Sequence, residues 1–278
     1  MHVGDPCADY PNVNARGYHL MSSPWLSVIT VVKDDPKGLA RTIDSLREQD
    51  LSNVEVLIID GSHDRQTAEE IGSPLASIHW ECPAGIYPAM NSGLHRAKGS
   101  FVSFLNAGDR FHSPDVLSRV RATMSETCTW AFGPVTLIGH DGTSVVTPPW
   151  DYAHERDQLF SRGSFPQHQG VFTRREVLSE LGGFSSDYRI AADYHSFLRL
   201  SKRADPCLLD FVVADFHEGG VSTTQWRESF REFHRARRSV FKPHGFLAAR
   251  ERWNTAVHFA RVWVYRDVVL PLRRLARR

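Results

Sequence analysis

The residues most able to do chemistry stand at the ends of two apolar segments. Residues 101–105 are a short run of strand-forming apolar residues, and the turn that follows them ends in Asp109. Asp60 ends a second such segment in the same way. Acids at the carboxyl ends of parallel strands lie where open α/β sheets bind ligands, and Asp109 could give Mg²⁺ or Mn²⁺ an oxygen ligand. The alternative is that Asn106, Asp109 and Asp60 only satisfy the amides of their turns.

A parallel sheet would bring these two acids together. Leu26–Val32 predicts a first strand buried on both faces, and Val54–Asp60 a second, because both are almost wholly apolar or β-branched. A helix at about residues 64–71, a short strand at 78–81 and a helix starting near Pro88 continue the alternation, which predicts a nucleotide-binding α/β half-domain. No Gly-x-Gly-x-x-Gly follows the first strand and no Gly-x-x-x-x-Gly-Lys-Ser/Thr occurs. That argues against a dinucleotide site and excludes a P-loop.

The second half of the chain has a different pattern. Residues 130–137 and 144–147 favour two short strands, joined as a hairpin. Helices are expected at about residues 174–181 and 191–203, and an apolar strand at 208–214. The regular strand–helix alternation of the first half does not continue here.

Length and cysteine content limit the class of protein. The 278 residues suit one large α/β domain or a domain with an appendage. The four cysteines lie far apart and form no Cys-x-x-Cys pair, which argues against a zinc site and a disulfide framework and fits a reducing cytosol. We find no secretory signal and no apolar stretch suited to cross a membrane, so a cytoplasmic protein is expected.

The two ends of the chain differ from its body. Residues 1–24 are rich in Pro, Asn, Gly and Asp and predict a loose leader. From Arg227 onward, 14 Lys and Arg oppose 4 Asp and Glu, a net charge of +10, so the remainder carries −9 of the total of +1. A basic helical segment with tryptophans suits an anionic membrane surface; a merely solvated helix face is the alternative. With an acidic body and no nucleic-acid module, no nucleic-acid partner is expected.

Five motifs stand in an order that resembles family 2 glycosyltransferases of the GT-A fold. Val-Leu-Ile-Ile-Asp60-Gly-Ser-His-Asp64 resembles that family's second strand, and residues 85–93 resemble its Gly-Ile-Tyr-Asp-Ala-Met-Asn-Lys-Gly segment. Residues 104–109 are similar to the segment with its DxD-type metal motif. Residues 188–194, preceded by His168-Gln169, resemble the stretch that holds its catalytic base. Gly219-Gly220-Val-Ser222 fits the branch that builds bacterial surface polysaccharides and glycolipids, and the resemblance covers roughly residues 25–222.

The resemblance implies a fold and a reaction. The fold is a Rossmann-like, mostly parallel sheet flanked by helices, here with a basic helical C-terminal appendage. The reaction uses a nucleotide diphosphate sugar and Mn²⁺ or Mg²⁺, and displaces the leaving group directly, with inversion. The implied roles are catalytic base for Asp193, metal ligand for Asp109, donor nucleotide contacts for Thr30, Asp60, Asn91 and Asn106, and diphosphate or acceptor contacts for His168, His217 and Tyr87.

Two departures from the family pattern bear on these roles. Asn106 and Gly108 leave Asp109 as the only carboxylate of the metal motif, so the donor diphosphate is expected to supply much of the coordination. Ala192 stands where the base motif often has Glu. Asp193 itself has a second interpretation as the N-cap of its helix.

The expected organisation follows these motifs. Residues 25–112 form a nucleotide-sugar-binding half, 113–226 an acceptor-binding and catalytic half, and 227–278 a basic amphipathic tail. The predicted function is sugar transfer to a hydroxyl of a glycan or lipid-linked acceptor, at the inner face of the cell membrane if the tail binds it. The alternatives are a non-catalytic sugar-nucleotide-binding protein and a nucleotidyltransferase.

Overall fold

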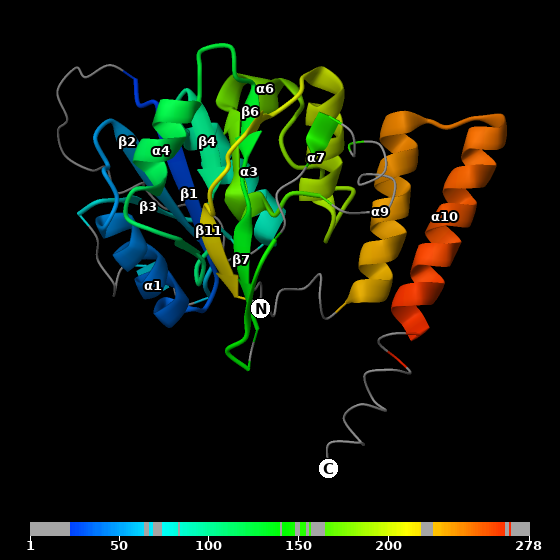
Figure 1. Cartoon of the computed structure of the whole chain (residues 1–278). Helices are drawn as coiled ribbons and strands as arrows, with labels where there is room; N and C mark the ends of the chain where they lie inside the picture. The colour runs from blue at the N-terminus through cyan, green and yellow to red at the C-terminus, as the bar shows by residue number, and fades with distance from the viewer. Residues whose placement is uncertain are drawn as a thin grey trace, which may run out of the picture.

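The computed structural model describes residues 23–63, 67–68, 74–82, 84–139, 141–147, 151–153, 156, 165–217, 225–264 and 267. Most of the expected leader, most of the expected helix at 64–71 and the Gly219–Ser222 motif lie outside these residues. Figure 1 shows the described elements as a strand-and-helix body with two long helices along one side.

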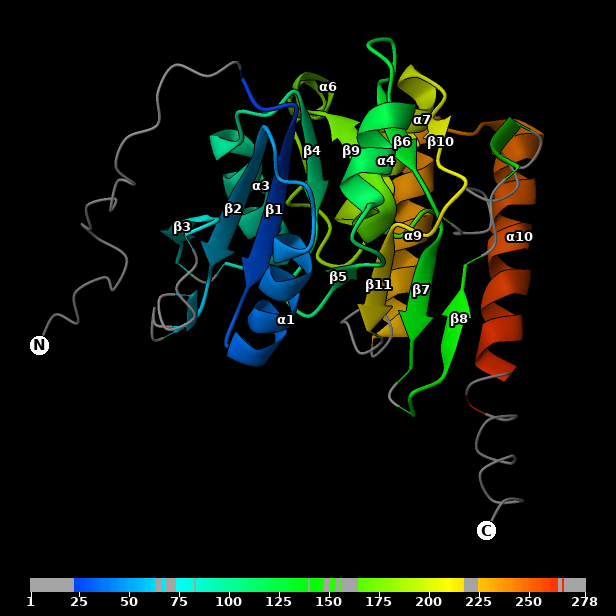
Figure 2. The ribbon, with the colours of Figure 1, turned by 60° about the vertical axis from the view of Figure 1, so that its left-hand side comes forward.

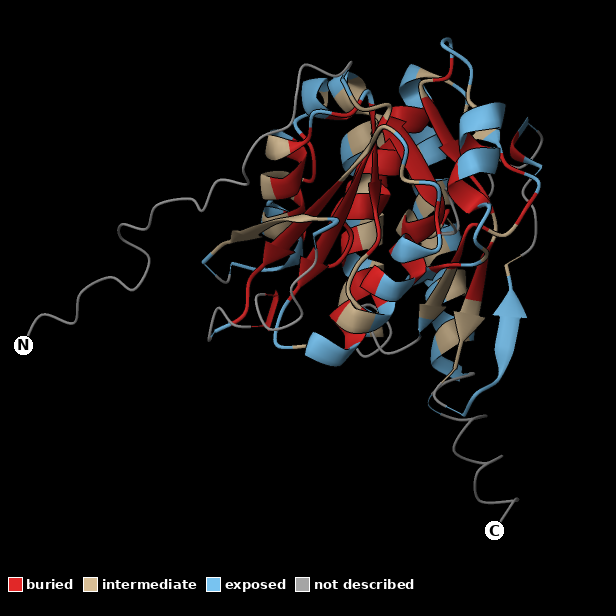
Figure 3. Cartoon of the chain, turned by 90° about the vertical axis from the view of Figure 1, so that its left-hand side faces the viewer, coloured by how far each residue is buried: buried red, intermediate tan, exposed pale blue. Residues whose placement is uncertain are grey.

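Four strands from the first half of the chain form a parallel array. They are β1 (Leu26–Val32), β2 (Val54–Asp60), β3 (Ser77–Trp80) and β4 (Phe101–Phe104). The expected first and second strands are confirmed to the residue. β1 is buried along its whole length, as predicted for a strand covered on both faces, and Figure 3 shows the buried residues concentrated in these central strands.

Two helices cover opposite faces of this array. α1 (Pro36–Arg47) begins with proline after the N-cap Asp35, whose carboxylate accepts the N–H of Gly38 at 2.8 Å. In α1, Leu39 packs with Val32 of β1. In α3 (Ile86–Arg96), Met90 packs with Ile29 of the same strand. Since alternate residues of a strand point to opposite faces, the sheet is a buried middle layer.

The second half of the chain extends the main sheet and changes its direction. It adds β6 (Trp130–Phe132), β9 (Val171–Arg174) and β10 (Cys207–Leu208), giving the order β10-β6-β9-β4-β1-β2-β3. β9 is antiparallel to both β4 and β6. The short helix η1 (His168–Gly170) precedes β9, and α6 (Arg175–Glu180) follows it. α7 (Ala192–Arg203) confirms the helix expected near 191–203.

A second, smaller sheet lies beside the first. Its strands are β5 (Arg110–Phe111), β11 (Ala214–His217), β7 (Val135–Ile138) and β8 (Ser144–Val146), hydrogen-bonded in that order. Figure 2 shows them side by side. The antiparallel pairing of β7 with β8 confirms the expected hairpin.

Two expected strands are each split between the two sheets. Residues 130–137 form β6 and β7, and residues 208–214 form the end of β10 and the start of β11. The two segments pass from one sheet to the other side by side, where the N–H of Val213 donates to the carbonyl of Pro134 at 2.8 Å. A Cβ added to Gly133 would lie 2.8 Å from the side chain of Val213, so the crossing is too close for a larger residue. An apolar run does not reveal such a crossing, because its residues are buried in either sheet.

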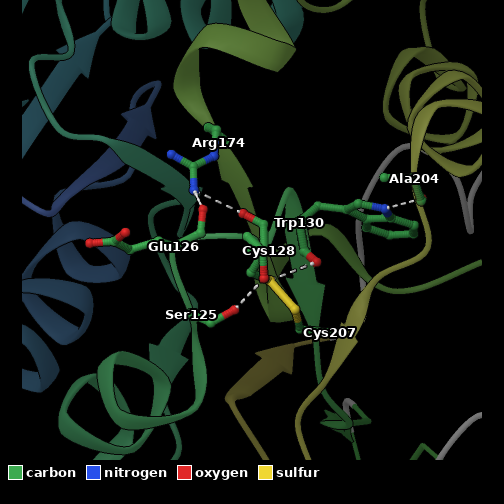
Figure 4. Close-up of a disulfide and its surroundings, with 8 residues drawn as sticks. Ser125, Glu126, Cys128, Trp130, Arg174, Ala204 and Cys207 are labelled. Atoms are coloured by element: carbon green, nitrogen blue, oxygen red, sulfur yellow. Dashed lines mark hydrogen bonds between the residues drawn. A yellow bond between two sulfur atoms is a disulfide. The ribbon is translucent and has the colours of Figure 1, made fainter.

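The expectation of no disulfide framework was wrong, as the described cysteines 128 and 207 show. Cys128 and Cys207 are joined by a disulfide although 79 residues separate them (Figure 4). β10 pairs with β6 in the sheet, which brings the two Cα atoms to 6.2 Å. Spacing along the chain gave no sign of a contact that depends on strand order.

Two antiparallel helices follow the two sheets, in agreement with the helical C-terminal appendage that the sequence predicted. α9 (Trp226–Phe241) packs on α7, and α10 (Gly245–Trp263) lies on the far side of α9 (Figure 1). Buried Arg237 of α9 bonds to Glu251 and Thr255 of α10 at 3.1 and 2.8 Å. Among the helices described here, none combines the length and apolar character needed to cross a bilayer.

Candidate active site

A cavity of about 550 Å³ opens at the carboxyl ends of β1, β2 and β4. This is the edge where the sequence predicted a ligand site. Its walls come from the ends of these strands, the start of α3 and the end of β11. The polar side chains that line it belong to Lys33, Asp35, Arg41, Glu81, Asn106, Asp109 and His217.

Asp109 is fixed by the loop that carries it. Gly108 turns with a φ of 99°, a value that favours glycine. The Thr42 hydroxyl of α1 donates to the carbonyl of Asp109 at 2.7 Å and accepts the N–H of Gly108 at 3.0 Å. The Asp109 carboxylate accepts one side-chain hydrogen bond, from Nε2 of Gln169 at 2.8 Å.

Burial changes the proton affinity of Asp109. The residue is only 5% exposed, and burial raises the pKa of its carboxyl to about 6. The hydrogen bond from Gln169 and the charges of His168 and Arg41 oppose this rise in pKa. A cation beside the carboxylate would favour its charged form further.

The residues around Asp109 suit a hard cation only with help from a ligand. Within the described residues, no group of three or more His, Cys, Asp or Glu could hold a metal ion by itself. Asn106 nevertheless offers Oδ1, a buried acceptor without a hydrogen-bond partner, in the same loop as Asp109. Oxygen atoms are the ligands that Mg²⁺ and Mn²⁺ prefer. The donor set therefore fits an incomplete shell that other oxygens must finish.

Asp193 lies in the first turn of α7 and accepts two hydrogen bonds. Its Oδ1 accepts the N–H of Tyr194 at 2.7 Å and, at 3.0 Å, the proton of the Tyr87 hydroxyl, which it shares with the carbonyl of Ile190. Its Oδ2 lies 3.5 Å from Nδ1 of His168, and its side chain is 11% exposed. Ala191 is the N-cap of α7, so Asp193 is inside the helix rather than capping it.

The turn η1 connects the two carboxylates. His168 lies between Asp193 and the cavity, with its Nε2 2.9 Å from Nδ2 of Asn106. The next residue, Gln169, bonds to Asp109. In the neutral tautomer that accepts the amide of Asn106 at Nε2, the ring proton of His168 is on Nδ1, facing Asp193. The expected residues Asp109, Asn106, His168 and Asp193 thus form one connected set.

Tyr87 holds Asp193 rather than facing the cavity. Its hydroxyl donates to the carbonyl of Ile190 at 2.6 Å and lies 3.0 Å from Asp193. Burial, and next the charge of Asp193, raise the pKa of Tyr87 well above its usual value. His217, by contrast, does line the cavity, at the end of β11.

Three expected donor-binding side chains do not line the cavity in this structure. The carboxylate of Asp60 accepts the N–H groups of Ser62 at 2.9 Å and Ala68 at 3.0 Å, which is the turn-capping alternative. The amide of Asn91 makes two hydrogen bonds with the backbone of Phe184, at 2.8 and 2.9 Å. The hydroxyl of Thr30 is buried and has no hydrogen-bond partner. All three shape the surroundings of the site.

Two cations of the cavity were missed in the sequence. Lys33 follows β1 directly, and Arg41 projects from α1 towards Gly108. Lys33 could have been found, because it stands at the carboxyl end of a predicted strand. Arg41 gave no signal, since one arginine on an exposed helix position is common. Together they make the cavity suited to a polyanion such as a diphosphate.

Comparison with known sequences finds one family model and several relatives that are all glycosyltransferases. The family model described as glycosyl transferase family 2 matches residues 27–182. An uncharacterized glycosyltransferase of Mycobacterium tuberculosis is 32% identical over 214 residues, which cover 73% of this chain and 79% of that protein. A PGL/p-HBAD biosynthesis glycosyltransferase of Mycobacterium bovis is 30% identical over 217 residues, covering 73% and 81%.

Solved structures share the fold at lower identity. A mannosyltransferase from Pyrobaculum calidifontis, in complex with GDP-Man and Mn²⁺, superposes with a TM-score of 0.61 at 17% identity, over 93% of this chain and 79% of that one. Residues 1–349 of S. aureus TarS, in complex with UDP-GlcNAc, give a TM-score of 0.63 at 18% identity, over 86% and 73%. At these identities the likeness shows the fold alone, and it confirms the expected GT-A fold.

Proposed function

Because the chain belongs to glycosyl transferase family 2 and is therefore a glycosyltransferase, we propose that it moves one sugar from a nucleotide diphosphate sugar to a hydroxyl of an acceptor, with inversion. The observation that carries the proposal is the linkage of the cavity loop at Asp109 to Asp193 through His168 and Gln169. A leaving-group site and a proton acceptor joined in this way are what a direct displacement requires.

The donor occupies the cavity at the carboxyl ends of β1, β2 and β4. Its volume of about 550 Å³ suits a small ligand. The structures of similar fold were solved with GDP-Man and with UDP-GlcNAc, which supports a nucleotide sugar as the class of donor. Lys33, Arg41 and His217 contact the diphosphate, since they are the basic groups that line the cavity.

Asp109 and Asn106 would hold a divalent cation at the site of the diphosphate. A bound Mn²⁺ or Mg²⁺ supplies charge neutralisation of the leaving diphosphate. The neighbouring mannosyltransferase was solved with Mn²⁺. The Oδ1 atom of Asn106, which has no hydrogen-bond partner, supports a second protein ligand beside Asp109.

Asp193 is the base that accepts the proton of the attacking hydroxyl. The acceptor oxygen forms a bond to the anomeric carbon, the bond from that carbon to the diphosphate breaks, and the nucleoside diphosphate leaves with its electrons. Nδ1 of His168 lies 3.5 Å from Oδ2 of Asp193, close enough to keep the carboxylate oriented. Tyr87 holds it from the other side.

The acceptor is a glycan or a lipid-linked acceptor, and α10 brings the enzyme to an anionic membrane surface. Phe246 and Trp253 of this helix are 78% and 71% exposed. Arg250, Arg252 and Arg261 are exposed on the same helix. Aromatic side chains with cations around them are typical of helices that lie in a membrane interface.

The transfer proposal is tested with purified full-length protein, Mn²⁺ and the UDP, GDP and dTDP forms of common sugars. We expect one base to bind in calorimetry and its sugar nucleotide to release nucleoside diphosphate when an acceptor is added. Release of pyrophosphate would instead indicate a nucleotidyltransferase. Binding without turnover against a broad acceptor set would indicate a non-catalytic binding protein.

The membrane proposal is tested by sedimentation with vesicles. The double variant Trp253→Ser/Trp263→Ser should bind vesicles containing phosphatidylglycerol about tenfold more weakly than wild type. The control Val145→Ser removes an apolar side chain that is 62% exposed on β8 and should bind as wild type does. Equal binding by all three proteins, or equal binding to pure phosphatidylcholine, would contradict the proposal.

A further inference from the structure

The segment that leads into Asp193 is held by one carboxylate from the C-terminal helices. Glu232 of α9 accepts the N–H of Arg189 at 3.0 Å through Oε1. Its Oε2 accepts the N–H groups of Ile190 at 2.8 Å and Ala191 at 2.9 Å. We propose that Glu232 is a positioning residue for the proposed base Asp193. This inference rests on the proposed function.

The hydrogen bonds of Glu232 to the backbone account for the burial of its carboxylate. The residue is 6% exposed, and burying a carboxylate is costly unless hydrogen bonds replace its water. Three consecutive backbone N–H groups provide that replacement, and such charge-assisted bonds are the stronger kind. Arg235 lies 3.8 Å from Oε1 of Glu232 and is more than half exposed, so it is a weak partner for this charge. A glutamine of the same shape has only one acceptor oxygen, so it could not satisfy the same three donors.

The helix that carries Asp193 lacks a cap of its own. Ala191 is the N-cap of α7 and makes no side-chain cap hydrogen bond. Glu232 puts a negative charge beside this helix N-terminus, where backbone N–H groups favour it. A residue 41 positions further along the chain thus takes the place of a local capping side chain.

The segment that precedes Asp193 is hydrogen-bonded by two helices, α3 and α9. Tyr87 of α3 donates to the carbonyl of Ile190 at 2.6 Å, while Glu232 accepts the N–H of the same residue. Earlier in the segment, Arg235 of α9 donates to the carbonyl of Asp187 and lies 4.8 Å from the ring of Tyr188. Because Asp193 follows only three residues after Ile190, fixing Ile190 fixes where the carboxylate of Asp193 lies.

The three hydrogen bonds that Glu232 accepts from Arg189, Ile190 and Ala191, called the clamp below, make α9 part of the structure that positions Asp193. Other residues of α9 supply its packing, among them buried Ala236 and the ring of Phe233, which lies 4.9 Å from that of Tyr194. Glu232 adds hydrogen bonds to one backbone segment, the one before the base. Its removal should affect the transfer step more than the binding of donor, because the donor cavity contains no residue of α9 among those described.

The experiment compares Glu232→Gln with Glu228→Gln, which makes the same change one turn earlier, where Glu228 pairs with Arg231 on the surface. Both are made in the wild-type and in the Asp193→Asn background, and residual rates are measured with a radiolabelled donor. We expect Glu232→Gln to lower kcat about 30-fold with the Kd of the donor nucleotide within twofold. Glu228→Gln should stay within twofold of wild type. In the Asp193→Asn background, Glu232→Gln should lower the rate by less than twofold.

Two results would overturn the inference. One is a kcat for Glu232→Gln equal to that of Glu228→Gln. The other is the same fold loss in both backgrounds, which would mean a general structural defect rather than an effect through Asp193. Failure of the wild type to transfer any sugar would refute the proposed function instead.

Amide hydrogen exchange of the wild type keeps the inference testable if Glu232→Gln does not fold. The N–H groups of Ile190 and Ala191 should exchange as slowly as those of β1, and Glu232→Asp, which keeps the charge, should exchange faster at these positions and lose kcat. Exchange of both amides in wild type at the rate of the exposed turn at Gly142 would contradict the clamp.

Discussion

Asp109 and Asp193 are both nearly buried carboxylates of one site, yet different partners surround them. Asp109 accepts one side-chain hydrogen bond, from Gln169, and one from the backbone of His217, and burial raises its pKa to about 6. Asp193 also accepts two hydrogen bonds, and Nδ1 of His168 lies 3.5 Å from its carboxylate. The two acids differ in position: Asp109 lines the cavity, where a cation would favour its charged form, whereas Asp193 lies beyond His168 and is oriented by Tyr87 and Tyr194. The difference separates a binding role from a chemical one.

The largest expected effect is on Asp193. Asp193→Asn should lower kcat about 1,000-fold, because an amide cannot accept the proton of the attacking hydroxyl. The Kd of the donor nucleotide should stay within threefold. The control Asp187→Asn changes an exposed acid of the same segment and should keep wild-type kcat. A kcat of Asp193→Asn above a tenth of the wild-type value would contradict the role of Asp193 as the proton acceptor.

Asp109 should act through the metal instead. In Asp109→Asn, the Kd of the nucleoside diphosphate measured with Mn²⁺ should rise about 50-fold, because the only carboxylate of the loop is gone. Without divalent cations the Kd should be unchanged. Calorimetry on Asp115→Asn, an exposed acid of the next helix start, provides the control. Equal loss of affinity with and without Mn²⁺ would mean that Asp109 does not act through a metal.

The two acids should also differ in how they affect stability without metal. The pKa of Asp109 is raised in the folded state, to about 6 from 3.8, so folding favours the protonated form. The charge of Asp109 therefore opposes folding fully above pH 6, by about 2–3 kcal/mol, and not at all below about pH 4.

The stability difference can be measured by thermal unfolding in EDTA. At pH 8, Asp109→Asn should raise the Tm by about 5 °C, and this gain should shrink as the pH falls from 6 towards 4. Asp193→Asn should show no such gain, since it loses an acceptor of two hydrogen bonds. A constant Tm difference across this pH range would contradict the raised pKa.

The smallest expected effect concerns His168. His168→Asn should lower kcat about tenfold, because Asp193 keeps its bonds from Tyr87 and Tyr194. The Kd of the nucleotide with Mn²⁺ should change little, since Asp109 is held by the neighbouring Gln169. His95→Asn, on the exposed face of α3, is the matched control for steady-state kinetics. A loss as large as that of Asp193→Asn would make His168 the proton acceptor itself.

The first half of the fold could be predicted from sequence because its signals are local. The strands β1 and β2 are unbroken apolar runs. The end of such a run also locates the acid that follows it, so the sequence could place Asp109 at the carboxyl edge of the sheet, where the cavity lies. Asp193 was found through a motif rather than through its contacts. The alternative reading of Asp60 as a turn cap was equally local, and the structure has that contact.

What could not be predicted depends on contacts between distant segments. The crossing at Gly133-Pro134 splits two apolar runs that each look like one strand. The disulfide of Cys128 with Cys207 requires β10 to pair with β6. Glu232 looks like any glutamate of a basic helix until α9 packs on α7. In each case the residue type carries no information about the partner.

The disulfide also divides the chain into a covalent ring and its exterior. The ring from Cys128 to Cys207 contains Gln169 and Asp193, whereas Asp109 and Glu232 lie outside it. Closing a loop of about 80 residues lowers the entropy of the unfolded chain, which on a chain-entropy model favours folding by about 4.5 kcal/mol. An oxidising environment would thus stabilise the folded chain through a ring that contains the proposed base, whereas Glu232 holds the segment before that base by hydrogen bonds from outside the ring.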